Sequence, residues 1–312
     1  MFDRFACPTM DSTFKLLFGE DSHKKITLAF LNDILSREGD NEIKDIDFIK
    51  QEQTPRRFDE RKMILDISCK TKAGHKFIIE MQRDRESYFK KRAVAYSAQL
   101  ICRQLSPTDS YIKLMPVIFI GILGDEGSDE TINKRKNTKS ISHNVFMDKD
   151  TQEQSIDLVE LVFVDLKKFN KQIHELENAR DKWLFFLKRA MYQKDIPEAY
   201  NDSPMIQEAF RVMERMNWSD AQIYTYEEEL RAFKRDVTQK EADEQERKKL
   251  EQEKETLKQE KEELVKEVKA SKQEGERKAK EEAAVNFLKL GLSIEQVSQG
   301  TGLSIEEVKK LQ

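Results

Sequence analysis

The composition of the chain changes sharply near Glu227, and this change most constrains the fold. Between Glu241 and Glu282 roughly two-thirds of the residues are charged, the two signs are interspersed, and proline is absent. Such a tract cannot bury an apolar core, so it forms either a long solvated helix or a disordered segment. A folded domain therefore has to come from the preceding residues, and about 200 residues are enough to bury a sizeable core.

The first part of the chain alternates between helical and strand-like periodicity. Apolar residues recur at helical spacing in some segments and at every second position in others, and one run, Pro116–Leu123, is continuously apolar, as in a buried central strand. The predicted helices are 14–18, 24–35, 86–105, 175–192 and 204–216, and the predicted strands are 43–49, 63–71, 75–82, 116–123, 140–147 and 158–166. We predict a domain over residues 1–217, a charged helix over 218–282 and a helical tail over 283–312.

Two of these strands, 63–71 and 75–82, are separated by only Lys72–Gly74 and should form a hairpin. A three-residue loop whose glycine takes the left-handed conformation sets Thr71 opposite His75. In that register Asp66 lies directly across from Glu80. A slip by one residue would put the two carboxylates on opposite faces, so the arrangement requires this register or a compensating bulge.

Two carboxylates that face each other in a hairpin repel, and strand interiors are poor in Asp and Glu. A cation would remove that cost, and carboxylate oxygens are the ligands that Mg²⁺ or Mn²⁺ prefers. Gln82, two residues beyond Glu80 on the same face, could orient a metal-bound water but cannot readily accept its proton. On spacing alone the alternative stays open that Asp66 and Glu80 are ordinary exposed positions of a half-solvated sheet.

Four stretches carry a resemblance to a known family. They are DSTFKLLFG (11–19), ILDISC (64–69), FIIEMQ (77–82) and YFKKRAVAYSAQL (88–100). In these stretches the chain resembles the Rpn family of recombination-promoting nucleases and transposases, within the PD-(D/E)XK nuclease superfamily, and the resemblance continues over most of the chain. It implies an α/β fold with a restriction-endonuclease-like core, in which helices flank a mixed sheet.

The resemblance also implies a metal-dependent DNA endonuclease linked to recombination, mobile elements or phage defence. In the superfamily an Asp and the acid of an E-x-K pair hold the ion, and these roles fall here on Asp66 and Glu80. The position that Lys usually holds is Gln82. Many Rpn-like sequences also read E-x-Q, but the missing cation leaves water activation and transition-state charge less well explained.

Two further pairs of residues belong to the predicted site. Asp11 precedes a helical run and would suit its N-cap, while Lys15 of the same motif could reach a phosphate. Arg92 and Tyr96 lie four residues apart, so they share a helix face, where Arg92 could hold a DNA phosphate and Tyr96 could stack or position water. The alternatives are a cap with a salt bridge for the first pair and a surface Arg packed over an aromatic ring for the second.

Composition excludes several other function classes. The net charge of −4 argues against a surface coated in nucleic-acid-binding charge, although a local basic groove remains compatible with it. Three widely spaced cysteines and four scattered histidines fit neither a zinc site nor a disulfide framework. No apolar segment is long enough to span a bilayer, so we expect a cytoplasmic protein without membrane contact. A glycine-rich phosphate loop and a Ser/His/Asp arrangement are also missing.

The charged tract carries half of a heptad pattern. Leu250, Leu257 and Leu264 recur every seven residues, but most alternate core positions hold Arg or Lys. The tract is therefore either a spacer or a weak coiled coil that forms a homodimer.

The last thirty residues regain an apolar pattern with two serine caps, Ser293 and Ser304, and a turn at Gly300 and Gly302. This unit resembles a small helix-turn-helix. Its final helix offers only Lys309 and Lys310 as cations beside acidic residues, so a packing or oligomerisation element is the alternative to DNA contact.

The leading hypothesis for the whole chain is a Mg²⁺-dependent DNA endonuclease. The second is a catalytically weak DNA-binding or scaffold protein that oligomerises through the charged helix.

Overall fold

The computed structural model describes residues 4–50, 52–53, 63–83, 88–124 and 139–312. By its internal contacts the chain divides into two units, Met1–Phe233 and Lys234–Gln312. The first unit includes the opening turns of the long helix. The division of the chain into three parts at residues 217 and 282 stays a prediction.

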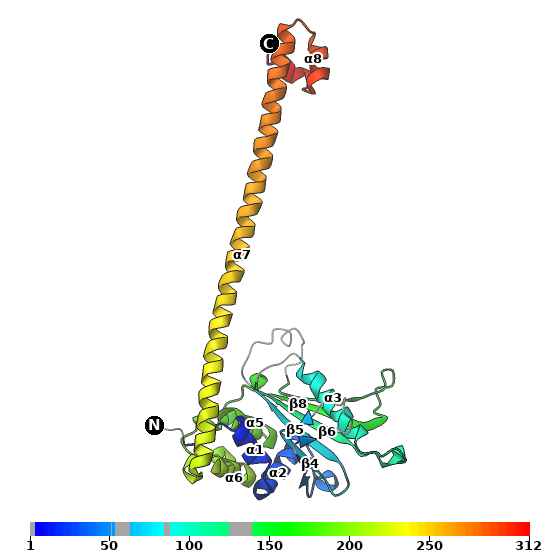
Figure 1. The fold of residues 1–312 in the computed structure, drawn as a ribbon, viewed down its shortest axis with the longest axis vertical. Helices are drawn as coiled ribbons and strands as arrows, with labels where there is room; N and C mark the ends of the chain where they lie inside the picture. The colour runs from blue at the N-terminus through cyan, green and yellow to red at the C-terminus, as the bar shows by residue number, and fades with distance from the viewer. Residues whose placement is uncertain (1–3, 51, 54–62, 84–87, 125–138) are drawn as a thin grey trace. The chain divides into compact units, whose positions relative to one another are not determined.

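Eight helices and eight strands are assigned in the described residues (Figure 1). The helices are α1 (Asp11–Phe18), α2 (Lys24–Leu35), α3 (Phe89–Cys102), α5 (Ala179–Arg189), α6 (Pro204–Val212), α7 (Asp220–Lys289), α8 (Ile294–Thr301) and α9 (Ile305–Lys309). The strands are β1 (Asp47–Phe48), β2 (Glu52–Gln53), β3 (Met63–Ile64), β4 (Ile67–Lys70), β5 (Lys76–Gln82), β6 (Val117–Leu123), β7 (Ile141–Phe146) and β8 (Ile156–Asp165). Short 3₁₀ turns connect several of them.

The first unit is built on a mixed six-stranded sheet with the order β1-β4-β5-β6-β8-β7. β5, β6 and β8 run parallel, whereas β4 pairs with β5, β1 with β4 and β7 with β8 in antiparallel fashion. All seven residues of β6 are buried, as expected for a continuously apolar run at the centre of a sheet. The predicted α/β class with a mixed sheet is confirmed.

Helices cover both faces of this sheet (Figure 1). One apolar cluster joins α1, α2, α5 and α6 to one face and contains the aromatic side chains Phe18, Phe30 and Trp183. A smaller cluster joins α3 to the opposite face through Phe89, together with Ile78. The parallel strands therefore end at one edge, between α1 on one side and α3 on the other.

The strand predicted over residues 63–71 is not continuous. β3 pairs with β2 in a separate two-stranded sheet, and only β4 pairs with β5. Leu65 is fully buried in the cluster that covers the Ile78 face of β5, so the chain breaks its alternation at Leu65 and Asp66. The strand predicted over 43–49 is likewise reduced to β1, and the start of the helix predicted at Glu86 lies outside the described residues.

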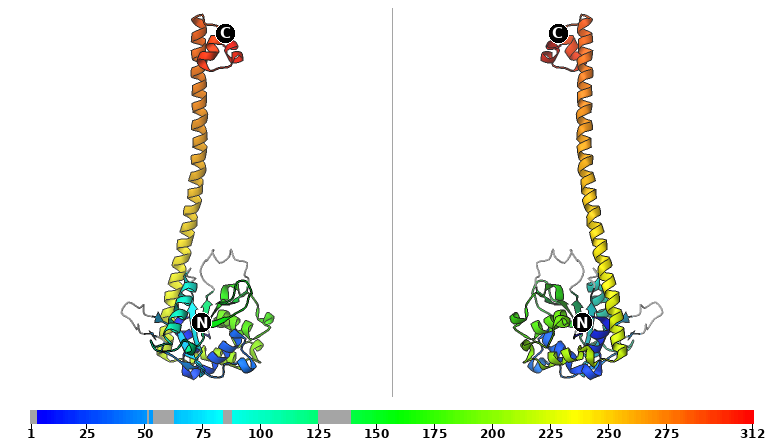
Figure 2. Two further views of the ribbon diagram at one scale, coloured as in Figure 1. Left: turned by 90° about the vertical axis from the view of Figure 1, so that its right-hand side faces the viewer. Right: turned by 90° about the vertical axis from the view of Figure 1, so that its left-hand side faces the viewer.

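The second unit consists of the rest of α7 and the two short helices that follow it. Figure 2 shows α8 and α9, in red, beside the end of α7. Ala284 of α7, Val297 of α8, and Leu303 and Val308 share a small buried core. Ser293 and Ser304 both form capping boxes, as predicted, but Gly300 lies within α8 and only Gly302 takes a left-handed conformation, at φ 73°.

Leu250, Leu257 and Leu264 of α7 are 59%, 58% and 62% exposed, so the heptad positions of this helix face solvent. Within the described ranges, no helix is both long and apolar enough to cross a membrane.

Candidate active site

The hairpin has the predicted register. Ile67 pairs with Ile79 and Lys70 with Lys76, while the Thr71 N–H donates to the carbonyl of His75 at 2.9 Å. Gly74 takes a left-handed conformation, at φ 93°. Asp66, the residue before β4, therefore stands across from Glu80 of β5, at the point where the pairing of β4 with β5 begins.

The two carboxylates are joined through backbone amides. The Asp66 N–H donates to Glu80 Oε1 at 3.0 Å, and the Met81 N–H donates to Asp66 Oδ2 at 2.8 Å. The side chain of Asp66 thus takes the place of a ladder carbonyl where β4 begins. Each carboxylate uses one oxygen in this exchange, and the second oxygen of each is available to a ligand.

Burial makes both carboxyl groups hard to ionise. Desolvation, followed by the charge of Asp66, raises the pKa of Glu80 to about 8, and the charges of Arg92 and Lys15 only partly oppose this rise. Desolvation also raises the pKa of Asp66, against the hydrogen bond from Met81. Glu80 is buried and Asp66 is partly buried, so the charge of each disfavours the charge of the other, and a bound cation would offset this cost.

Arg92 of α3 reaches the end of β5. Its guanidinium donates a hydrogen bond to Oε1 of Gln82 and lies 5.0 Å from the ring centroid of Phe89. Tyr96, one turn further along α3, is half-buried and packs against the apolar cluster under that helix. The structure therefore brings Arg92 and Gln82 together, whereas Tyr96 contacts apolar side chains.

Asp11 and Lys15 approach from the other face of the sheet. Lys15 Nζ lies 2.8 Å from an Asp11 carboxylate oxygen, one helical turn away. Burial alone would lower the pKa of Lys15, but the hydrogen bond and charge of Asp11, with the charge of Asp66, raise it. The prediction that Asp11 is the N-cap is wrong: Met10 is the N-cap residue and supplies no side-chain hydrogen bond, because Asp11 already lies in the first turn and pairs with Lys15.

Gly121 allows α3 to lie close to the site. It stands opposite Glu80 on β6, and a Cβ at this position would lie 2.6 Å from Cε1 of Phe89. Only glycine leaves room for that ring against the sheet. Phe89 in turn closes the apolar layer on the side of Glu80 that faces α3, which explains the strong desolvation of this carboxyl group.

Sequence reasoning missed Asp165, a carboxylate 6% exposed at the end of β8. The register places it level with Leu123 and Gln82, at the edge where the parallel strands end. An acid that closes a buried apolar run was the available signal, because the carboxyl ends of parallel strands share an edge.

The site suits a hard divalent cation with few protein ligands. No group of three or more His, Cys, Asp or Glu side chains that could hold a metal is found among the described residues. Mg²⁺ usually keeps several waters and binds through one or two carboxylates, often with substrate phosphates. The available oxygens of Asp66 and Glu80 fit this donor set.

Comparison with known proteins supports the same reading of the fold. The family model of the PD-(D/E)XK nuclease family transposases matches residues 8–244, which include every element of the first unit from α1 onward. No curated protein and no solved structure matches the chain. The matched range covers most of the sequence, so the chain belongs to the PD-(D/E)XK nuclease family transposases.

Proposed function

We propose that this protein is a cytoplasmic, metal-dependent DNA endonuclease that serves recombination, mobile elements or phage defence. The observation that carries the proposal is the buried pair of Asp66 and Glu80, each held by a backbone amide of the other's strand and each keeping one oxygen for a ligand. Two carboxylates that can hold a divalent cation suit the hydrolysis of a phosphodiester.

In this proposal Asp66 and Glu80 hold Mg²⁺ or Mn²⁺. A bound ion of this kind lowers the pKa of water and neutralises charge that develops on the phosphate. Gln82 orients the attacking water, and Arg92 fixes the Gln82 amide through its hydrogen bond. Arg92 also supplies a positive charge next to Gln82, the residue that stands where the superfamily usually has Lys, and Lys15 adds a second cation from α1.

DNA binding is proposed along α3 and α1. Lys90 and Lys91 are exposed in the first turn of α3, which also holds Arg92, so this end of the helix carries a cluster of basic residues. Phosphate contacts of this type position a duplex without reading its sequence. Tyr96 is proposed to support Arg92 on the same helix face.

The test is nicking of supercoiled plasmid in Mg²⁺, Mn²⁺ or EDTA. Asp66→Asn and Glu80→Gln keep the hydrogen-bond acceptors but remove the charges, so each should reduce nicking by at least about 1,000-fold. Glu160→Gln is the matched control, because Glu160 is a carboxylate of the same sheet that pairs with His143 at 2.8 Å. Cleavage retained in both site variants would overturn the metal site.

The second candidate function is a catalytically weak DNA-binding or scaffold protein. Gln82 in place of Lys favours it, since a glutamine cannot serve as a cation or a base. Retarded migration of DNA without cleavage in any metal would select this alternative.

We also propose that two copies associate through α7 as a parallel coiled coil. With Leu250, Leu257 and Leu264 at the core positions d, the g positions hold Glu253, Glu260, Glu267 and Glu274. An antiparallel pair would oppose these glutamates, whereas a parallel pair sets Glu253 against Lys258 and Glu267 against Lys272 of the second copy. Replacing the three leucines with Ala should halve the mass in solution measured by light scattering, and a monomeric wild type would contradict the dimer.

A further inference from the structure

Helix α1 lacks an N-cap of its own, and α7 supplies one. The side chain of the N-cap residue Met10 makes no capping hydrogen bond, and Asp11 is paired with Lys15. Glu229 fills the gap, because its Oε2 accepts from the Ser12 N–H at 3.2 Å and from Ser12 Oγ at 2.8 Å. A carboxylate at this point satisfies a first-turn amide and complements the helix dipole.

The same segment of α7 also fixes the chain that enters α1. The hydroxyl of Tyr226 accepts from the Cys7 N–H at 3.0 Å, and the carbonyl of Cys7 accepts from Thr13 Oγ1 at 2.6 Å. Tyr226 is only 2% exposed, so this contact belongs to the core of the first unit. The start of α1 is thus held from α7 at two separate points.

A third contact joins α7 to the end of β5, the strand that carries Glu80 and Gln82. The guanidinium of Arg83, the residue after Gln82, lies 3.6 Å from the ring centroid of Phe233. Arg83 also donates to the sulfur of Met10, which is the N-cap residue of α1. Phe233 therefore packs where β5 and α1 come together.

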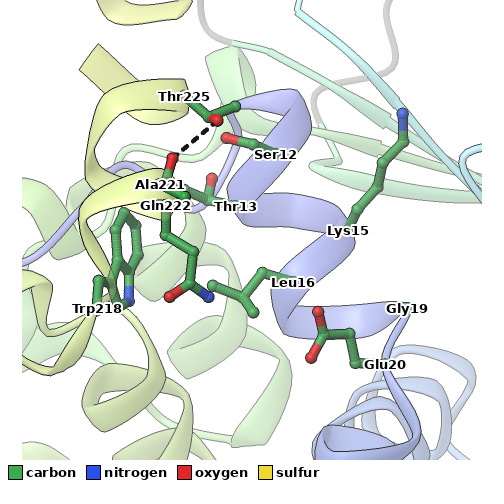
Figure 3. A pocket seen from close by; sticks show the side chains of 10 residues that line it. All are labelled: Ser12, Thr13, Lys15, Leu16, Gly19, Glu20, Trp218, Ala221, Gln222 and Thr225. Atoms are coloured by element: carbon green, nitrogen blue, oxygen red, sulfur yellow. Dashed lines mark hydrogen bonds between the residues drawn. The ribbon is translucent and has the colours of Figure 1, made fainter.

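Figure 3 shows the directions in which the side chains of Ser12 and Lys15 leave α1. Ser12 points toward α7, across a pocket of about 390 Å³ that Trp218, Gln222 and Thr225 also line. Lys15 leaves α1 in a different direction, away from Trp218 and Gln222. Ser12 and Lys15 lie one turn apart on the same short helix, so a shift of its first turn would also move Lys15.

We propose that Glu229 is a positioning residue, which caps α1 and thereby holds Lys15 beside Asp66 and Glu80. The inference rests on the proposed function of that pair. It makes the opening segment of α7, Asp220–Phe233, a functional part of the first unit, Met1–Phe233 (the nuclease unit). This segment then differs in role from the charged helix that follows it. The family match agrees, since it extends to residue 244 and includes this segment.

The test compares Glu229→Ala and Glu229→Gln with Glu228→Ala in the full chain. Glu228 is the matched control because it is exposed and pairs with Arg231 on its own helix at 2.6 Å. Loss of the cap should lower the plasmid nicking rate about five- to tenfold in Glu229→Ala. Glu229→Gln keeps an acceptor oxygen and should retain most of the rate, and Glu228→Ala should match the wild type.

A double-mutant cycle separates positioning from general destabilisation. In a Lys15→Ala background, Glu229→Ala should have little further effect, whereas in an Arg92→Ala background it should reduce the rate by its full factor. Additive effects in both backgrounds would overturn the role through Lys15. Amide hydrogen exchange over residues 11–18 should also rise in Glu229→Ala and not in Glu228→Ala.

The outcomes distinguish this inference from the function on which it rests. A wild type that cleaves, with Glu229→Ala equal to it in rate and in exchange of α1, would overturn the positioning role alone. A wild type that neither binds nor cleaves plasmid DNA would overturn the proposed function and the positioning role with it.

Discussion

Carboxylates in the two units of this protein have opposite environments. Glu80, at the end of a buried strand, is 5% exposed, and burial raises its pKa to about 8. Glu307, in the first turn of α9, is exposed, and hydrogen bonds from Ser304 lower its pKa. The same side chain is thus hard to ionise in the nuclease unit and easy to ionise in the tail, because desolvation dominates in one place and hydrogen bonding in the other.

The comparison indicates which of the two units has charged groups in an environment suited to catalysis. The charged helix carries many acids and bases, but water solvates them and they pair within one helix, as Lys248 does with Glu244. Such pairs contribute little to stability. In the nuclease unit Asp66, Glu80, Arg92 and Lys15 are partly or fully shielded from water and interact electrostatically with one another. Unfavourable burial, not the number of charges, marks the site.

The largest expected effect concerns metal binding. Both carboxyl groups must ionise to hold a cation, so protons and metal compete for Glu80. With a pKa of about 8 for Glu80, lowering the pH from 8 to 6 should weaken Mn²⁺ binding about 50-fold, as measured by titration calorimetry. Glu80→Gln should abolish the binding, and Glu307→Gln should leave it unchanged. An affinity that is constant over this range would contradict the buried pair.

The next effect is on the stability of the metal-free protein. The folded-state pKa of Glu80 is raised from 4.5 to about 8, so the folded state binds more protons than the unfolded state between these values. The free energy of unfolding should therefore be highest below pH 4.5 as far as Glu80 is concerned, and should fall by on the order of 5 kcal/mol as the pH rises from 4.5 to 8.

Urea denaturation of the nuclease unit across this pH range measures the effect. Glu80→Gln should flatten the decline and stabilise the metal-free protein at pH 8. Glu307 gives the opposite sign, because its lowered pKa contributes stability that is lost as the pH falls below the ordinary value. If Glu80→Gln leaves the pH profile of unfolding as it is, the carboxyl group is not buried in solution.

Two glycines extend the comparison to packing. Gly121→Ala should destabilise the nuclease unit by about 1–3 kcal/mol, because its Cβ would lie 2.6 Å from the Phe89 ring. Gly275→Ala, in the middle of α7, meets no atom within 4 Å and should stabilise the helix by about 1 kcal/mol. Thermal unfolding followed by circular dichroism measures both changes. Equal shifts of the unfolding temperature with the same sign in Gly121→Ala and Gly275→Ala would contradict the expected difference between the two sites.

The smallest expected effect is on the tail. Ser304 accepts from the Glu307 N–H and closes a capping box on α9. Ser304→Ala should destabilise α8 and α9 by roughly 1 kcal/mol, and Ser304→Asp should keep the cap. Hydrogen exchange over residues 294–309 measures the change. Nicking activity should be the same in both variants, and a loss of activity would link the tail to the nuclease site.

Much of this protein is determined by local sequence. The spacing of apolar residues predicted α2, because backbone geometry fixes a period of 3.6 in a helix, and a continuous apolar run predicted β6 as a buried strand. The charged composition of the tract beyond Glu227 gave a long solvated helix as one of two alternatives. The Lys72–Gly74 loop predicted the register of the hairpin, since its length and its left-handed glycine leave one pairing. The serine caps of the tail were predicted for the same reason, because each cap acts within one helical turn.

The tertiary structure decided what those elements do together. Alternation alone could not show that the chain breaks at Asp66, because the break depends on β3 pairing elsewhere. The hydrogen bond of Arg92 to Gln82 and that of Ser12 to Glu229 join residues 10 and 217 positions apart in the sequence. No local pattern encodes such contacts, since they arise only when packing against a shared core brings the elements together. The sequence by itself therefore determined the acids and their register, and only the fold determined their burial, their cations and the cap that α7 provides.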